Sequence, residues 1–235
     1  MDMILRLDRN NFARDEMLEV CRAKFALNPA ELEKIDTFEQ TYISKDAARW
    51  YTKDCFLYRL LNESLQIGSI DLMVKLRYFI HDLHNQLAEL QLDFFRSLPV
   101  HNPILTLYRG LTMTLPELNK FQQNETHLVS TNSFLSTTRD FAAALFFSGE
   151  GKVEDPQVSV VYEIFVDTSI SHSVPFASVE YQSIFKDEDE VLFSMAAMFR
   201  IGRTKEIGER LWKIKLTLTP PNEEQWNILT QHLKK

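Results

Sequence analysis

The hydrophobic period of the sequence changes near Pro103, and this change constrains the fold more than any other feature. Before it, apolar residues recur at steps of three and four residues, the spacing of an amphipathic helix: Leu72, Leu76, Ile80, Leu83, Leu87 and Leu90. After it, the segment RLWKIKLTLT (210–219) alternates apolar and polar side chains, as a half-buried strand does. A helical half followed by a β-rich half predicts an α+β fold.

The first 97 residues are predicted to form a helical lobe. Asn28, Pro29 and Glu31 provide the N-cap, the first-turn proline and the acidic residue that are typical of a helix start. Ser44 is expected to cap one helix over residues 45–65. The leucine pattern predicts a further amphipathic helix of about six turns over residues 72–90.

Residues 98–220 are predicted to form a β-rich lobe, a mainly antiparallel β-sandwich with one buried face. Strands are expected at 104–110, 127–138, 158–166 and 210–219. Two short helices interrupt them, one after Thr114, where Glu117 completes a capping box, and one after Thr138. Residues 149–157 are expected to form an exposed loop and residues 221–235 a C-terminal helix, all within one domain overall.

Composition excludes several classes of partner. The 235 residues carry a formal net charge of -7, the wrong sign for binding phosphate backbones or anionic membranes. No apolar run approaches the ~18 residues of a membrane span, and the first residues lack the apolar core of a secretory signal. Cys21 and Cys55 match no metal or redox spacing, which favours free thiols in a reducing compartment. We therefore expect an intracellular, cytoplasmic protein with no nucleic-acid partner and no membrane partner.

Common nucleotide and metal motifs are incomplete. Gly149 and Gly151 begin like a dinucleotide fingerprint, but Glu154 stands where its third glycine would be, and no phosphate-binding P-loop closes there. His81 and His84 lie one helical turn apart and could share a metal, but the sequence places no third ligand beside them. We predict neither a Rossmann or P-loop site nor a metal.

The first of three short motifs that can carry chemistry is Leu107–Gly110. Arg109 ends an apolar strand and can present a planar fork of donors to a phosphate or carboxylate. Gly110 would let the backbone pass close to a ligand. The alternative for this motif alone is an arginine that caps the sheet.

The second motif, Phe134–Thr138, leaves an alternating strand and enters a helix. Its three consecutive hydroxyls, on Ser136, Thr137 and Thr138, can cap that helix and still leave one facing a ligand. Capping alone is the alternative.

The third motif sets four consecutive acids, Asp187 to Glu190, against the apolar run Val191–Phe193. If the strand begins near Glu188, the side chains of Glu188 and Glu190 point to one face and that of Asp189 to the other. Two neighbouring carboxylates are costly unless a cation comes between them. The pair is therefore a candidate general base and cation stabiliser, with a solvated turn as the alternative.

These three motifs, in this order and behind a helical lobe, resemble the arginine-specific mono-ADP-ribosyltransferases of the R-S-E class. The resemblance covers most of the chain, because the motifs fall between Tyr108 and Phe193 and the segment 49–65 looks like the lobe that precedes them in the family. It implies an enzyme that cleaves NAD between nicotinamide and ribose and transfers ADP-ribose to arginine side chains of proteins. Thr138 stands where the family often has serine, and its hydroxyl is retained.

The resemblance implies four catalytic residues. Glu190 would stabilise the oxocarbenium-like cation and hold the ribose 2'-hydroxyl, while Glu188 would orient the acceptor guanidinium and take its proton. Arg109 would hold an NAD phosphate, and Ser136 would orient Glu190 and the ribose. The backbone at Gly110 would bond the nicotinamide amide. The implied NAD-binding set is Tyr108, Arg109, Gly110, Ser136, Thr137, Phe146 and Phe147.

Phe146 and Phe147 are candidates for an aromatic wall against the nicotinamide, and a role in the core is an equal alternative. The loop 177–187 matches the segment that meets the acceptor. There Tyr181 and Phe185 are aromatic residues that could grip the acceptor, next to Glu188.

The implied partners are NAD and an arginine-bearing protein acceptor, which includes the enzyme itself, with no cofactor beyond NAD as substrate. Two alternatives remain open. One is an NAD glycohydrolase in which water is the acceptor. The other is a catalytically silent module that binds NAD or a protein.

Overall fold

A computed structural model describes residues 2–53, 55–99, 103–170, 172, 174–182 and 189–219. The chain divides into two compact units. The first comprises Met1–Arg96, Asn132–Leu135 and Pro175–Ala196, and the second comprises Ser97–Thr131, Ser136–Val174 and Ala197–Lys235. Two segments that the sequence analysis assigned to the β-rich lobe, 132–135 and 175–196, thus lie in the first unit.

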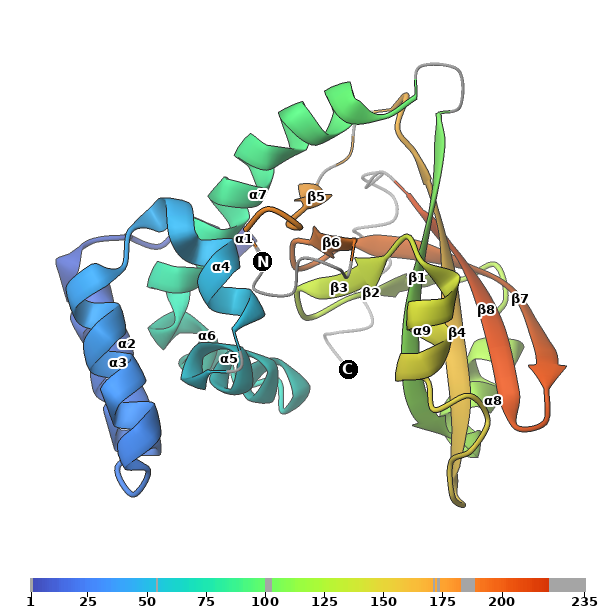
Figure 1. Cartoon of the computed structure of the whole chain (residues 1–235), viewed down its shortest axis with the longest axis horizontal. Helices are drawn as coiled ribbons and strands as arrows, with labels where there is room; N and C mark the ends of the chain where they lie inside the picture. Colours follow the sequence, from blue (N-terminus) through green and yellow to red (C-terminus); the bar gives the residue numbers. More distant parts are fainter. Residues whose placement is uncertain are drawn as a thin grey trace. The chain divides into compact units, whose positions relative to one another are not determined.

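The first unit is mainly helical (Figure 1). Its helices are α1 (Asp2–Leu5), α2 (Asn11–Lys24), α3 (Pro29–Thr41), the 3-10 turn η1 (Ser44–Asp46), α4 (Ala47–Thr52), α5 (Phe56–Gln66), α6 (Ile70–Lys75) and α7 (Arg77–Ser97). The predicted start of α3 is confirmed. The Asn28 side chain accepts a hydrogen bond from the Glu31 backbone N–H at 3.3 Å, and Pro29 opens the helix.

The helix predicted over residues 45–65 is wrong as a single element. Ser44 lies in η1 and does not cap a helix, and α4 has no side-chain cap. Lys53 adopts an extended conformation (φ -70°, ψ 139°), which ends the α-helical hydrogen-bond ladder after Thr52. A second helix, α5, then begins at Phe56.

The leucine pattern over 72–90 is also divided between two helices. Leu76 ends α6, and α7 begins at the next residue. The Arg77 guanidinium accounts for part of this break, because its Nη1 donates to the Val74 carbonyl at 2.8 Å and so satisfies a carbonyl of the last turn of α6. Its Nη1 also binds Glu16 of α2 at 2.7 Å.

Aromatic side chains form the centre of the first unit. Phe38 of α3 is fully buried and meets Trp50, Phe56 and Phe79 edge-on, with ring centroids 5.0, 5.9 and 6.4 Å away. Its other neighbour, Tyr42, stacks on it at 4.2 Å. Rings at these separations gain contact energy beyond the area they bury, so α3 is tied to α4, α5 and α7.

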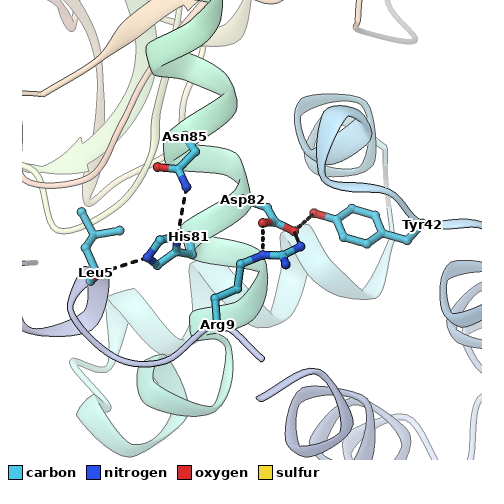
Figure 2. Close-up of polar contacts among 6 residues, drawn as sticks. All are labelled: Leu5, Arg9, Tyr42, His81, Asp82 and Asn85. Atoms are coloured by element: carbon cyan, nitrogen blue, oxygen red, sulfur yellow. Dashed lines mark hydrogen bonds and ion pairs between the residues drawn. The ribbon is translucent and has the colours of Figure 1, made fainter. Parts of the chain in front are cut away.

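A buried carboxylate in α7 connects separate segments of the first unit through hydrogen bonds. Asp82 is only 3% exposed and accepts from both Nε and Nη2 of Arg9, the latter at 2.7 Å. The hydroxyl of Tyr42 donates to the same carboxylate at 2.8 Å (Figure 2). The hydrogen bond to Asp82 raises the pKa of Arg9, and burial, followed by the Asp82 charge, raises the pKa of Tyr42. The buried Asp82 carboxylate therefore accepts three hydrogen bonds, two from Arg9 and one from Tyr42.

In the described part of the second unit the strands follow the order β2-β7-β8-β4-β1-β3, with the first residue of β3 in the first unit. They are β1 (Ile104–Thr114), β2 (Leu128–Ser130), β3 (Leu135–Thr138), β4 (Gln157–Asp167), β7 (Met198–Gly208) and β8 (Leu211–Leu218). β4 and β8 run parallel, and the other neighbouring pairs in this unit are antiparallel. The alternation predicted for β8 is confirmed, since Ile214, Leu216 and Leu218 are buried.

Two short helices belong to the second unit. The capping box predicted for α8 (Leu115–Gln123) is confirmed: the Thr114 N–H donates to Glu117 Oε2 at 2.7 Å, and the Glu117 N–H donates to Thr114 Oγ1 at 3.4 Å. The helix predicted after Thr138 is α9 (Phe141–Phe147).

α9 lies directly on β1 (Figure 1). A Cβ atom at Gly110 would come within 1.8 Å of the Ala144 carbonyl oxygen and 2.7 Å of the Ser148 nitrogen. Only glycine permits this approach of two backbones. The backbone of α9 fills the space that a side chain at Gly110 would need, and the contact of the Gly110 backbone with the nicotinamide amide stays a prediction.

The first unit also carries a pair of short strands, β5 (Phe176–Ser178) and β6 (Glu190–Phe193), which run antiparallel with Phe176 opposite Phe193. The α+β class and the mainly antiparallel pairing are thus confirmed. The predicted C-terminal helix, 221–235, lies outside the described residues. No helix in the described parts of the chain is long and apolar enough to cross a membrane.

Replacement of Gly110 by alanine is predicted to destabilise the protein by about 3 kcal/mol or more, because two backbones must separate to admit the methyl group. The measurement is urea unfolding. Gly208→Ala is the matched control, since a Cβ there meets only the Leu211 side chain at 3.5 Å, and it should stay within about 0.5 kcal/mol of wild type. Equal stability of Gly110→Ala and wild type would contradict the packing of α9 on β1.

Replacement of Asp82 by alanine is predicted to lower the free energy of unfolding by about 3 kcal/mol, because Arg9 and Tyr42 lose their buried acceptor. Asp93→Ala in the same helix is the control. Asp93 is 81% exposed and pairs only with the exposed Arg96, so its loss should cost less than about 0.5 kcal/mol. Calorimetric melting of the two variants tests the difference.

Candidate active site

Arg109 connects the first two sequence motifs. It lies in β1 opposite Tyr162 of β4, and its guanidinium Nη1 donates to the Ser136 carbonyl at 2.7 Å. The two residues are 27 positions apart in the sequence and belong to the same unit. This hydrogen bond involves one nitrogen of a guanidinium that has five N–H donors.

The hydroxyl motif lies on β3, next to β1. Thr138 pairs with Tyr108 in the ladder, and Thr137 and Thr138 are buried, whereas Ser136 is half-buried. Thr138 Oγ1 accepts from the Asp140 N–H at 3.0 Å. Of the three hydroxyls, that of Ser136 is therefore the most accessible.

The N-cap of α9 is Asp140, not one of the three hydroxyls. Its side chain accepts from the Ala142 N–H at 2.8 Å. The prediction that the hydroxyls cap this helix is wrong, because the helix begins two residues further along, at Phe141. Aspartate before an apolar run is a strong N-cap signal, so the sequence contained the information.

α9 presents aromatic rings beside β1. Tyr108 meets Phe141 edge-on at 5.3 Å. Phe146 and Phe147 are 70% and 57% exposed, and their rings are 5.8 Å apart. The core role considered for this pair is wrong, and both rings are accessible to a flat ligand.

Tyr162 is a neighbour of Arg109 that the sequence analysis missed. Burial raises its pKa to about 12, against the lowering effect of the Arg109 charge. Its ring packs on Phe121 of α8 at 5.7 Å. Tyr162 therefore stays neutral at ordinary pH and supplies an uncharged surface beside the guanidinium.

Glu190 is the first residue of β6, in the first unit, and it is 7% exposed. The Glu190 carbonyl accepts from the Val179 N–H at 3.0 Å. Val179 directly follows β5, so the hydrogen bonds between β5 and β6 continue past the end of β5. A carboxylate this deeply buried is costly and needs a polar or cationic partner.

The third motif departs from the predicted strand alternation. Asp189 has a left-handed backbone (φ 42°), which a regular strand does not contain. The described strand begins at Glu190, and the predicted shared face of side chains 188 and 190 lies outside the described residues. Glu188 and Phe185 lie outside the described residues. Tyr181 follows β5 and is 87% exposed, as an acceptor-binding aromatic requires.

The two histidines considered as metal ligands have separate partners. The His81 ring accepts from Asn85 Nδ2 at Nδ1 (3.0 Å) and donates from Nε2 to the Leu5 carbonyl at 2.9 Å (Figure 2). His84 Nδ1 bonds Ser194 Oγ at 2.8 Å. No group of three or more histidine, cysteine or acidic residues in the described part of the chain could hold a metal ion.

Neither a family model nor a curated protein matches this sequence. Similar solved structures are ADP-ribosyltransferases. One is Vis, a toxin from Vibrio splendidus, in complex with agmatine; it is 19% identical, with a TM-score of 0.53 over 93% of this chain and 90% of that chain. HopU1 of Pseudomonas syringae pv. Tomato is 17% identical, with a TM-score of 0.55 over 86% and 87%. The Clostridium limosum C3 exoenzyme is 14% identical, with a TM-score of 0.54 over 86% and 94%. The chain therefore has the fold of these ADP-ribosyltransferases.

Proposed function

We propose that this protein is a mono-ADP-ribosyltransferase that uses NAD as its substrate and modifies arginine side chains of proteins. The observation that carries the proposal is the hydrogen bond from Arg109 to the Ser136 carbonyl, which brings two separate motifs of the family together. The fold supports it, because similar structures are ADP-ribosyltransferases over almost the whole chain.

The second unit supplies groups suited to the NAD molecule. Arg109 retains donors for a phosphate while one of its nitrogens is held by Ser136, so the fork is oriented before the substrate arrives. The exposed rings of Phe146 and Phe147 offer an apolar wall to the nicotinamide. No cofactor beyond NAD is needed for this chemistry.

Glu190 is the proposed stabiliser of the transition state. When the bond between nicotinamide and ribose breaks, its electron pair leaves with the nicotinamide, and positive charge develops on the ribose. A buried carboxylate stabilises such a cation more strongly than a solvated one does, because water does not screen the interaction.

Arginine is the proposed acceptor because of the second acid, Glu188. A guanidinium is protonated at ordinary pH, so it can form a bond to the ribose only if a base removes a proton as the new C–N bond forms. Agmatine, the compound bound to Vis, also carries a guanidinium group. Tyr181 and Phe185 would grip the acceptor, an intracellular protein or this enzyme itself.

Replacement of Glu190 by glutamine is predicted to lower transfer of labelled ADP-ribose from NAD to agmatine on the order of 10²- to 10³-fold, because the charge opposite the developing cation is lost. Glu206→Gln, on the exposed part of β7, is the matched control and should keep wild-type activity. Transfer that persists in Glu190→Gln would contradict its role.

Two measurements separate the competing functions, the release of free ADP-ribose and the calorimetric binding of NAD. Free ADP-ribose released at a rate that agmatine does not change would indicate a glycohydrolase. Calorimetric binding of NAD without any turnover would indicate a silent binding module.

Replacement of Arg109 by lysine is predicted to weaken NAD binding about tenfold or more. The single ammonium group of lysine cannot bond the Ser136 carbonyl and also present the planar pair of donors that a guanidinium offers to a phosphate. Isothermal titration with NAD measures the effect. Arg203→Lys, an exposed position of β7, is the control and should bind as wild type does. Unchanged affinity of Arg109→Lys would exclude Arg109 as the phosphate anchor.

A further inference from the structure

The strand that carries Glu190 is short. β6 contains four residues, and its partner in the first unit, β5, contains three. Residues with left-handed backbones flank it, Asp189 (φ 42°) before and Ala196 (φ 66°) after. Such conformations are unfavourable for residues other than glycine and are maintained by surrounding contacts. Side-chain contacts of this strand add to its backbone hydrogen bonds.

Helix α7 supplies one such contact through a row of aromatic rings. Phe193 of β6 stacks on Phe176 of β5 with ring centroids 4.8 Å apart. Phe176 in turn meets Phe94 and Phe95 of α7 at 6.3 and 5.3 Å. Apolar packing of this kind holds the strand pair against the helix, but it is weakly directional.

The second contact is directional. His84 of α7 bonds through Nδ1 to the hydroxyl of Ser194, the residue directly after β6, at 2.8 Å. Ser194 is fully buried, and its backbone N–H donates to the Pro175 carbonyl at 2.9 Å. His84 and Phe95 are three helical turns apart on one face of α7, about 16 Å along its axis. Two residues that are far apart on the helix thus contact the same end of the β5–β6 pair.

We propose that His84 is a positioning residue for Glu190: through Ser194 it fixes β6 along its own direction and so sets where the catalytic carboxylate lies. This role rests on the proposed function. The physical reason is that a strand is stiff along its length, whereas a displacement of about 1 Å at a catalytic group can cost on the order of 100-fold in rate.

The test uses the full chain with labelled NAD and agmatine. His84→Leu removes the hydrogen bond and keeps most of the volume. We expect kcat to fall on the order of tenfold, with the KM for NAD changed less than about twofold, because Glu190 acts in the transition state rather than in NAD binding. His84→Asn places an amide at the position of Nδ1 and should restore at least half of the wild-type kcat.

His81→Leu is the matched control. His81 lies on the same helix and bonds the Leu5 carbonyl and Asn85, so its loss removes hydrogen bonds of the same kind at a site away from β6. We expect a lower melting temperature with kcat within about twofold of wild type. An equal fall of kcat in His81→Leu and His84→Leu would overturn the proposal, since general destabilisation would then explain both.

A double-mutant cycle gives the decisive measurement. If His84 acts through Glu190, His84→Leu should not lower the residual rate of Glu190→Gln any further. A further tenfold fall in that background would overturn the positioning role while leaving the proposed function intact, as would wild-type activity of His84→Leu itself. Absence of NAD turnover by the wild-type protein would instead overturn the proposed function, and the positioning role with it.

Discussion

The close approach of α9 to β1 is the constraint on which the arrangement of the second unit depends. The two backbones come so near at Gly110 that any side chain there would strike the Ala144 carbonyl. This contact fixes α9 on the strand that bears Arg109. It also brings Phe141 against Tyr108 and leaves Phe146 and Phe147 exposed at the other end of the helix. One glycine thus determines where the aromatic side chains of α9 lie.

The sequence predicted those features whose signals are local. The capping box of Thr114 and Glu117, the start of α3 at Asn28 and the alternation of β8 each depend on residues a few positions apart, and each is confirmed. The order of the three motifs likewise predicted the fold that the structure has. Ser44 failed as a cap because it lies inside the 3-10 turn η1, and the extended conformation at Lys53 divides the segment; nothing in the local pattern marks either feature.

The site was less predictable where distant residues meet or the backbone is irregular. His84 and Ser194 are 110 positions apart, and no periodicity connects them. Asp189 broke the alternation from which a shared face of the two glutamates was inferred, because its left-handed backbone is stabilised by the fold and not by its own preference. Arg109 and Ser136 were assigned separately, but their hydrogen bond became visible only with β1 and β3 placed side by side.

The burial of Glu190 gives a physical reason for the contacts between α7 and the β5–β6 pair. A buried carboxylate costs stability, and an apolar residue at the start of β6 would continue the run Val191–Phe193 without that penalty. Buried ionisable groups of this kind are concentrated at functional sites. The same reasoning applies to the left-handed residues on both sides of β6, which a strand chosen for stability alone would avoid. These features agree with the proposed roles: β6 carries the catalytic carboxylate, and the aromatic and histidine contacts of α7 position that strand.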